Sequence, residues 1–432
     1  MKYLPIILHF FYIVFTLAFS FWGPRVYFDY NREIVLGFIA IYLIFICLGF
    51  YLGVHKKTEL IKSKSISEHS LIKILKISLK LSIILLISNV IYLYFSGSIN
   101  FNSVGSNYRD YYSNYREKTA VQTFTFELLL LILIAVPKFY SLVFGFFYFD
   151  KLGIFYKRLF VLLLALIVFT QTYAIGNQKS LGDIIIYSVI FLGLKAYYLS
   201  PKYRRKLFLR ASIILVLLFG FLSYSQFTRM ETVGVSADEI NEVIGDTFYY
   251  DTDHLIFHLF GPKLGLGMSV FISGYLSGGY YGLSLCLQLP FEWTYGIGNS
   301  VGLTTIVDKV FETDIYSKTY LGRMEETYGI PGKRQWHTVF PWLASDFSFY
   351  LLPIVLFIVA YLYGYCWREV LLFTNPISYL MFSLLTIFFV FVPANNQIFH
   401  GYDYIQITIF SAIYWLILHK RFNFKASDNS ND

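Results

Sequence analysis

The sequence contains few charged residues and few cysteines, and each shortage argues against a class of protein. Only 14% of the 432 residues are charged, whereas about a quarter are charged in soluble domains. The composition therefore lies outside the range of soluble proteins. Three cysteines, Cys47, Cys286 and Cys366, are far apart and lack metal-ligand spacing. They indicate small buried side chains rather than a disulfide framework or a zinc site.

Motifs for nucleotide, redox and zinc chemistry are also missing. The sequence has no Walker A motif, dinucleotide fingerprint, HExxH or CxxC pattern, so these reactions have no support in it. We therefore expect neither a metal nor a cofactor. The formal charge of +8 does not indicate nucleic acid binding, because the cations occupy short connectors between apolar segments, where they act as topology signals.

Long apolar segments make up most of the chain. Hydrophobic residues account for 56% of it and aromatic residues for 21%, and the mean hydropathy is +0.57. A helix needs about 20 largely apolar residues to cross a bilayer. This rule predicts an all-α, polytopic membrane protein with ten to twelve spans. Ten are placed at residues 4–22, 34–54, 74–95, 122–147, 159–176, 183–200, 208–227, 349–367, 376–394 and 404–419.

Basic connectors set the expected orientation. Lys and Arg are concentrated at 55–65, 150–158, 201–210 and 419–425, which favours the cytoplasmic side for these connectors and for both termini. The chain then divides into an N-terminal bundle, a large outer loop, C-terminal spans and a cytoplasmic tail, at 1–226, 227–348, 349–419 and 420–432. Smaller outer connectors are expected at 23–33, 96–121, 177–182 and 395–403.

Two features leave alternatives open. The uncharged segment 264–289 is long enough to cross a membrane, but its glycines at 274–282 disfavour a plain helix. We interpret it as short interfacial or re-entrant helices, with two full spans as the alternative. Lys138 follows Pro137 inside the fourth span. It either snorkels to the cytoplasmic face or lies inside on a kinked helix and serves function.

The loop at 227–348 is the expected working face. It holds 14 Asp and Glu against 7 Lys and Arg, a formal charge of −7, so the rest of the chain carries +15. Arg323 and Arg334 flank the turn-forming sequence GIPG and could converge on one anion. His337 precedes a span and suits a general base, with Asp346 nine residues on. Packing at an aromatic interface is the alternative role for His337.

Other outer residues suit substrate binding. Arg109 and Arg116 are seven residues apart among tyrosines that include Tyr112, and guanidinium groups with aromatic rings suit phosphate and sugars. An interfacial aromatic belt is the alternative for this connector. Further candidates are Lys179 in a short turn, Arg229 after the seventh span and Trp336 beside His337.

Two stretches carry a family resemblance: SGYLSGGYYGLSLCLQLPFEWTYGIGNS (273–300) and HTVFPWLASDFSF (337–349). With the plan of spans, they resemble the O-antigen polymerase (Wzy-type) family. The resemblance implies an inverting, metal-independent glycosyltransferase on the periplasmic face of the bacterial inner membrane. It would join repeat units carried on undecaprenyl pyrophosphate, both as donor and as acceptor. Membrane lipids and a chain-length regulator would be its other partners.

The resemblance also implies residue roles. Arg109, Arg229, Arg323 and Arg334 would bind pyrophosphate, and His337 would deprotonate the acceptor. The sequence departs from the pattern in having Arg334 where some members have glycine, and Lys179 where others have arginine. Two alternative functions share features of this plan. An O-antigen ligase also has a large outer loop and a histidine near a span, and a flippase of lipid-linked oligosaccharides usually has short loops and repeated halves.

Overall fold

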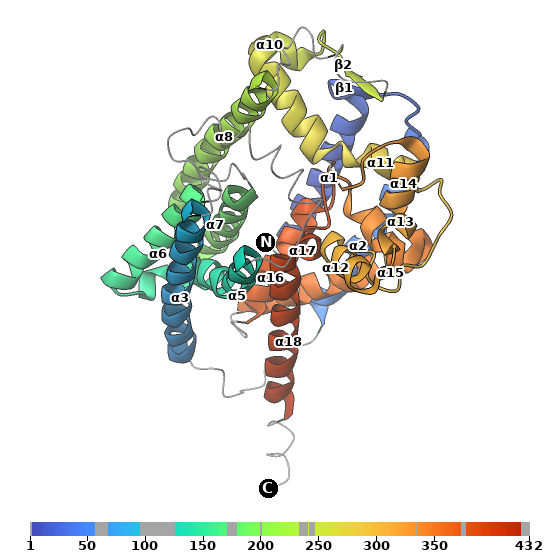
Figure 1. Ribbon diagram of the computed structural model, residues 1–432. Helices are drawn as coiled ribbons and strands as arrows, with labels where there is room; N and C mark the ends of the chain where they lie inside the picture. Colours follow the sequence, from blue (N-terminus) through green and yellow to red (C-terminus); the bar gives the residue numbers. More distant parts are fainter. Residues whose placement is uncertain are drawn as a thin grey trace. The chain divides into compact units, whose positions relative to one another are not determined.

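The computed structural model describes residues 2–56, 68–95, 126–170, 179–198, 201–232, 241, 247–333, 335–372 and 377–424. Over these residues the chain is mainly helical, which confirms the all-α prediction (Figure 1). Four predicted site residues, Arg109, Tyr112, Arg116 and Arg334, lie outside the described residues, and so does the side chain of Arg229.

The chain forms two compact units. The first unit comprises Met1–Lys56, Ser212–Arg368 and Leu384–Tyr402, and the second comprises Lys57–Ala211, Glu369–Ser383 and Asp403–Asp432. Several long helices therefore contribute residues to both, among them α8 (Pro201–Thr232), α15 (Val339–Leu372) and α16 (Ser378–Phe391). The predicted division into a bundle, a loop and C-terminal spans stays a prediction.

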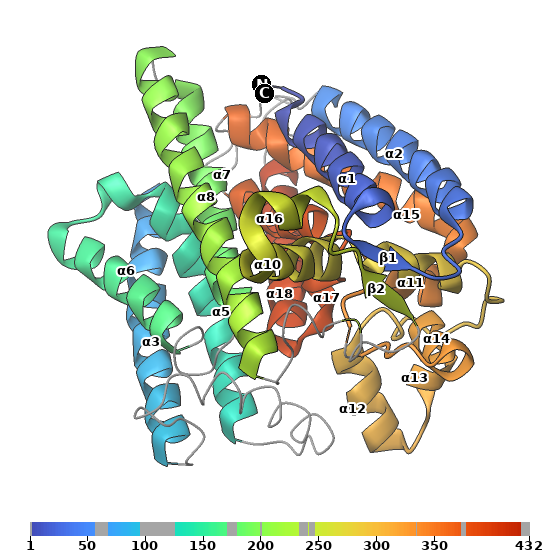
Figure 2. The same cartoon turned by 90° about the horizontal axis from the view of Figure 1, so that it is seen from above.

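Glycines allow close packing of two long helices in the first unit. These are α2 (Arg32–His55), which follows α1 (Leu4–Trp22), and α15. A Cβ built at Gly49 or Gly53 of α2 would lie 2.3 or 2.1 Å from a backbone oxygen of α15. Gly364 of α15 meets the Phe50 carbonyl of α2 in the same way, at 2.4 Å. Small residues four apart let membrane helices approach backbone to backbone, and α2 lies along α15 in Figure 2.

An antiparallel ribbon joins the connector after α1 to the large loop. Strands β1 (Arg25–Tyr27) and β2 (Phe248–Tyr250) pair in the register Arg25 to Tyr250. Helix α10 (Leu255–Ser269) follows and kinks at Gly261, whose φ of 75° precedes Pro262. A π-helical turn, Val270–Leu276, then leads to α11 (Gly279–Cys286). Short helices are thus present in 264–289, as expected, and Leu255–Cys286 as a whole is also long and apolar enough to cross a membrane.

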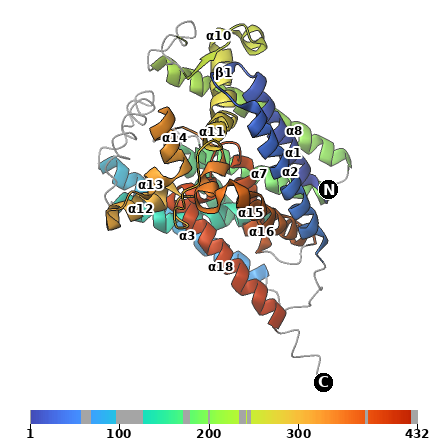
Figure 3. The ribbon, with the colours of Figure 1, turned by 90° about the vertical axis from the view of Figure 1, so that its right-hand side faces the viewer.

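Three short helices follow α11 in the described part of the large loop. They are α12 (Val301–Phe311), α13 (Ile315–Lys318) and α14 (Tyr320–Tyr328), with α12 and α13 next to each other (Figure 3). The predicted turn at 329–332 follows α14, which Gly329 ends at a φ of 69°. Helix α15 begins at Val339, and its path breaks at Ser348 (φ 59°). This break falls one residue before the predicted eighth span.

The second unit is a helical bundle. Helix α3 (Glu68–Phe95) packs on α5 (Phe126–Phe147) and α6 (Ile154–Ile167), and α5 packs on α7 (Lys179–Tyr198) (Figure 1). Buried leucines recur every four residues along α3, at Leu71, Leu75 and Leu79. This spacing presents one apolar face of the helix to its neighbours. A 3-10 turn, η1 (Phe149–Lys151), joins α5 to α6, and Lys151 pairs with Glu68 of α3.

Five helical stretches in the described part of the chain are long and apolar enough to cross a membrane. They are α1, α2, α3, Leu255–Cys286 and α15. Each of the ten predicted segments overlaps a helix within its described residues, the last of them α18 (Tyr402–Phe424). The structure is thus consistent with a helical membrane protein. The number of spans and the outer position of the large loop stay predictions.

Candidate functional site

His337 is buried in the first unit, in the stretch between α14 and α15. Only 2% of it is exposed, and its Nε2 lies 3.0 Å from the Pro331 carbonyl oxygen. A carbonyl can only accept, so Nε2 carries the proton and Nδ1 bears the lone pair. Burial lowers the pKa of His337 to about 4, against the smaller opposing effects of the Pro331 carbonyl and the Glu325 charge. The imidazole is therefore neutral at pH 7.

A turn held by Glu325 positions the carbonyl that orients His337. Glu325 Oε2 accepts from the Tyr316 hydroxyl at 3.1 Å and from the Gly332 N–H at 3.2 Å. Gly332 directly follows Pro331, so this carboxylate fixes the turn that presents the carbonyl. The tautomer of His337 is set through these bonds.

Helix α11 covers the other side of the ring. A Cβ built at Gly282 would lie 2.5 Å from His337 Nδ1, and one at Gly279 would lie 2.5 Å from the Thr338 nitrogen. Nδ1 is buried and has no hydrogen-bond partner. The imidazole therefore keeps a free basic nitrogen, which faces a helix whose glycines make room for it.

Unsatisfied polar atoms gather around the start of α15. In the described part of the chain, buried atoms without a hydrogen-bond partner include Thr338 Oγ1, Trp342 Nε1, Asn299 Oδ1, Asn396 Oδ1 and Gln397 Nε2. Short contacts link their segments: the Val339 N–H donates to the Val392 carbonyl at 2.9 Å, and the Asn396 side chain donates to the Asn299 carbonyl at 2.7 Å. Buried polar groups are nearly always paired in folded proteins. These atoms can form hydrogen bonds with a ligand or with water.

Asp346 holds the loop that precedes α12. Its Oδ1 accepts from the Thr294 hydroxyl and from the Gly298 N–H, at 2.5 and 3.2 Å. Its Oδ2 accepts from the backbone and side-chain N–H groups of Asn299, at 2.9 and 2.7 Å. Both carboxylate oxygens are thus satisfied by one loop. This geometry suits a positioning role, and the predicted catalytic role of Asp346 stays a prediction.

Arg323 anchors the opposite end of the same loop. Its Nη1 donates to the Pro290 carbonyl, at 2.5 Å, and lies 3.6 Å from Glu292 Oε1, while Nε donates to Lys318. The guanidinium is 4.8 Å from the Tyr320 ring centroid. One nitrogen, Nη2, is buried without a partner. Arg323 therefore anchors the loop and keeps one N–H donor group, Nη2, that can donate a hydrogen bond to an anion.

Trp336 and Lys179 lie against aromatic rings in different units. In the first unit, the Trp336 ring is 5.7 Å from that of Tyr275 and stacks on Phe391 at 6.2 Å. In the second unit, Lys179 Nζ is 4.4 Å from the centroid of the Tyr404 ring. The structure therefore associates Trp336 with the surroundings of His337. The predicted contacts of Trp336 and Lys179 with the substrate stay predictions.

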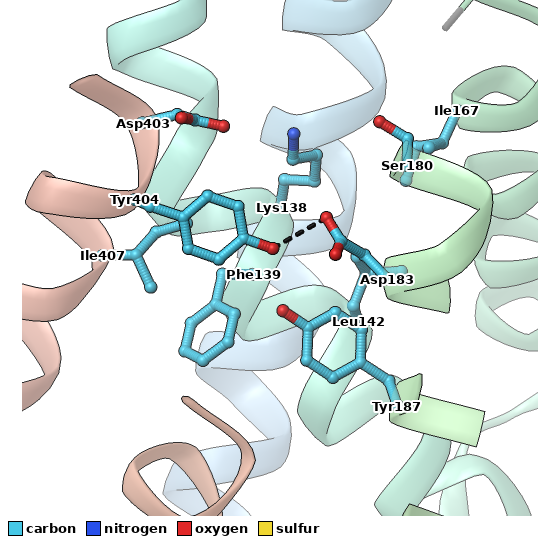
Figure 4. Close-up of a pocket in the computed structure, with 10 residues that line it drawn as sticks. All are labelled: Lys138, Phe139, Leu142, Ile167, Ser180, Asp183, Tyr187, Asp403, Tyr404 and Ile407. Carbon is cyan, nitrogen blue, oxygen red and sulfur yellow. Dashed lines mark hydrogen bonds between the residues drawn. The ribbon is translucent and has the colours of Figure 1, made fainter. Parts of the chain in front are cut away.

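A charged pocket lies in the second unit, between α5, α7 and α18 (Figure 4). The cavity has a volume of about 20 Å³, and Lys138, Asp183 and Asp403 line it together with apolar side chains. That space is enough for a water molecule. The Tyr404 hydroxyl donates to Asp183 Oδ2 at 2.7 Å, while Asp183 Oδ1 is buried without a partner. Lys138 is half-buried and lines this pocket, and both of its interpretations stay predictions.

Several of these residues were not predicted. Asn299, Asn396, Gln397 and Asp403 carry no recognisable motif. One signal was available, since Asn395, Asn396 and Gln397 are three consecutive amides between apolar helices, and amide side chains are rarely buried. They are 7, 0 and 1% exposed.

Comparisons with known proteins add no relative. No protein-family model, no curated protein and no solved structure matches this chain. The functional interpretation therefore rests on the residues and their geometry.

Proposed function

We propose that this chain is a membrane glycosyltransferase that joins oligosaccharide repeat units carried on undecaprenyl pyrophosphate, an O-antigen polymerase of the bacterial inner membrane. The observation that carries the proposal is His337, which is neutral, fixed in one tautomer by Pro331 and left with a free Nδ1. A general base must be deprotonated at the working pH and must offer a lone pair to the proton that it removes, and it is strongest when its pKa lies near that pH. A pKa near 4 keeps His337 deprotonated at pH 7 but makes it a weaker base than a histidine with a pKa near 7.

The proposed reaction uses a single displacement. The acceptor hydroxyl oxygen attacks the anomeric carbon of the donor sugar, and its proton passes to His337 Nδ1. The bond between that carbon and the pyrophosphate oxygen breaks, and undecaprenyl pyrophosphate leaves with the electron pair. Attack opposite the leaving group inverts the anomeric configuration. The unused Nη2 of Arg323 supports charge stabilisation of the leaving group.

The proposal requires helix α11 to move. His337 Nδ1 faces Gly282, so a hydroxyl reaches it only when α11 shifts away from the ring. The π-helical turn at Val270–Leu276 directly before α11 supports this step, since π-turns often occur at functional sites. The active site would face the periplasm, at the outer end of the spans.

The test is the lipopolysaccharide pattern of a strain that lacks the protein. Loss of the long ladder with core-plus-one-unit retained supports a polymerase. Complementation with His337→Gln should lower polymer formation by about 10²-fold or more, since general bases contribute 10²–10⁴-fold. His258→Gln, an exposed histidine of the same loop, should restore the full ladder. Equal ladders from both variants at equal protein levels would remove His337 from the mechanism.

A flippase of lipid-linked oligosaccharides is the second candidate, and the charged pocket favours it. Ionisable side chains among apolar helices often mark transport pathways, and Lys138, Asp183 and Asp403 form such a group. Loss of every O-unit band in the deletion strain would point to this function or to the O-antigen ligase. Loss of every O-unit band would therefore contradict the polymerase proposal.

A further inference from the structure

Arg25, on β1 in the first unit, carries a guanidinium with an unpaired donor within the described part of the chain. Its Nε is buried and has no hydrogen-bond partner, and among the described residues no carboxylate lies within ion-pair distance of it. The guanidinium instead lies 3.5 Å from the centroid of the Phe248 ring and 4.9 Å from that of Tyr27. Stacking on aromatic faces holds the group in place but satisfies none of its N–H donors. Those donors are left for a ligand.

The segments around Arg25 carry aromatic rings and a further unpaired polar group. The Tyr27 ring stacks on Tyr281 of α11 at 4.4 Å. Ser273, in the π-helical turn, is 2% exposed, and its hydroxyl has no partner. The next residue, Gly274, lies close to the arginine, since a Cβ built there would be 3.4 Å from Arg25 Nη1. A guanidinium and a hydroxyl, both unpaired, thus occur on adjoining segments.

The site lies where two candidate spans end. Helix α1 ends at Trp22 and α2 begins at Arg32, so Arg25 is in the short connection between them. Aromatic residues around it are exposed: Trp22 by 72%, Phe28 by 47% and Tyr249 by 40%. Exposed Trp and Tyr at the ends of spans are typical of the membrane–water interface. That level of a bilayer is where lipid phosphates lie.

We propose that Arg25 and Ser273 bind the phosphate group of a membrane amphiphile, with its headgroup against the Tyr27 and Tyr281 rings. A guanidinium presents its donors in a fork that matches phosphate oxygens, and a hydroxyl adds one more donor. The apolar part of the ligand continues along the exposed faces of the helices. The inference does not depend on the proposed sugar transfer, because binding is measured without turnover.

The experiment is a binding titration of the full chain, purified in a neutral detergent and stripped of lipid. The three probes are dihexanoyl phosphatidylglycerol, uncharged dihexanoylglycerol and inorganic phosphate. The variants are Arg25→Gln, Arg25→Lys and Ser273→Ala. Arg32→Gln is the matched control, because Arg32 is an exposed arginine at the first residue of α2, seven positions after Arg25. Thermal unfolding of each variant shows whether it is folded.

Wild type should bind phosphatidylglycerol and not dihexanoylglycerol. Arg25→Gln should weaken this binding by about tenfold or more, the size expected for a lost charge-assisted contact, and Arg32→Gln should leave it unchanged. Equal binding of inorganic phosphate would assign the same site to a soluble anion. If Arg25→Gln does not fold, Arg25→Lys and Ser273→Ala should each weaken binding about threefold or more. Unchanged binding in the folded Arg25 variants, or an equal loss in Arg32→Gln, would overturn the proposal.

Discussion

The Asp346 carboxylate accepts two hydrogen bonds from Asn299, one from its backbone N–H at 2.9 Å and one from its side-chain amide at 2.7 Å. The two residues are 47 positions apart in the chain. Together with the bonds from Thr294 and Gly298, this pair fixes the loop before α12 on the first turns of α15. The same loop is held at Pro290 by Arg323. Two predicted catalytic residues thus fasten the two ends of one segment.

Asp346→Asn should therefore loosen the loop. The amide keeps one acceptor oxygen and replaces the other with a donor, so the Asn299 N–H groups lose their acceptor. We expect a loss of about 2–4 kcal/mol in the free energy of unfolding and faster proteolysis within 290–300. Glu312→Gln, an exposed residue of the large loop, is the charge control and should leave both unchanged. Lost activity at normal stability would instead support the catalytic role predicted from the sequence.

The pH dependence of stability should report His337. Its pKa is about 4 in the folded chain and about 6.5 when unfolded, so between these values the unfolded chain binds more protons. The free energy of unfolding then rises with pH across this window, by at most about 1.4 kcal/mol per unit from this group. Above about pH 6.5 the contribution of His337 to the free energy of unfolding no longer changes with pH. As the pH falls from 6.5 towards 4, the folded chain loses stability because the unfolded chain takes up the proton more readily.

The measurement compares unfolding of wild type and His337→Gln from pH 4 to pH 8. Glutamine can still donate to the Pro331 carbonyl but does not titrate, so the difference in slope isolates His337. His258→Gln, at an exposed histidine of the same loop, is the control variant. Identical slopes in wild type and His337→Gln would mean that His337 binds protons equally in the folded and unfolded chain. The proposal that His337 is a neutral, buried base would then be wrong.

The helices could be predicted from the sequence because length and apolarity act locally. Helix α1 runs from Leu4 to Trp22, the limits that the apolar run sets. The break of α15 at Ser348 also matches the predicted start of a span at 349. Their packing could not be predicted in the same way. The spacing of Gly49 and Gly53 predicts a flat face on α2, but it does not predict which helix packs against that face.

The site was predicted in part. The turn at 329–332 and the position of His337 before a helix follow from GIPG and from the apolar run after residue 338. The partners of each side chain do not. Pro331 orients His337 and Gly282 covers it, and the second of these contacts joins segments 55 positions apart. Arg25 was missed because a single arginine between two spans is typical of an ordinary contact with lipid headgroups. Its stacking on the Tyr27 and Phe248 rings and its unpaired Nε are visible only in the structure.

The close contact between α2 and α15 makes a specific prediction for glycine substitutions. Gly53→Ala should lower the unfolding temperature, because its Cβ would lie 2.1 Å from the Tyr361 carbonyl oxygen. The helices must then separate, at a cost of about 1–3 kcal/mol. Gly37→Ala is the matched control on the same helix, since nothing lies within 4 Å of its Cβ. It should be neutral or stabilising, because alanine favours a helix by about 1 kcal/mol over glycine. Equal effects of both substitutions would contradict the packing of α2 on α15.

The charged pocket predicts a coupling between Lys138 and Asp183. Asp183→Asn leaves two lysines, Lys138 and Lys179, beside the single carboxylate of Asp403, so it should destabilise the chain. Adding Lys138→Met restores the balance of charge and should recover part of the loss. In a double-mutant cycle measured by thermal unfolding, we expect an interaction energy of about 1–3 kcal/mol. Lys73→Met, an exposed lysine of α3, should give additive effects with Asp183→Asn. An interaction energy near zero for Lys138 and Asp183 would show that the two side chains do not stabilise each other and that the pocket is not one electrostatic unit.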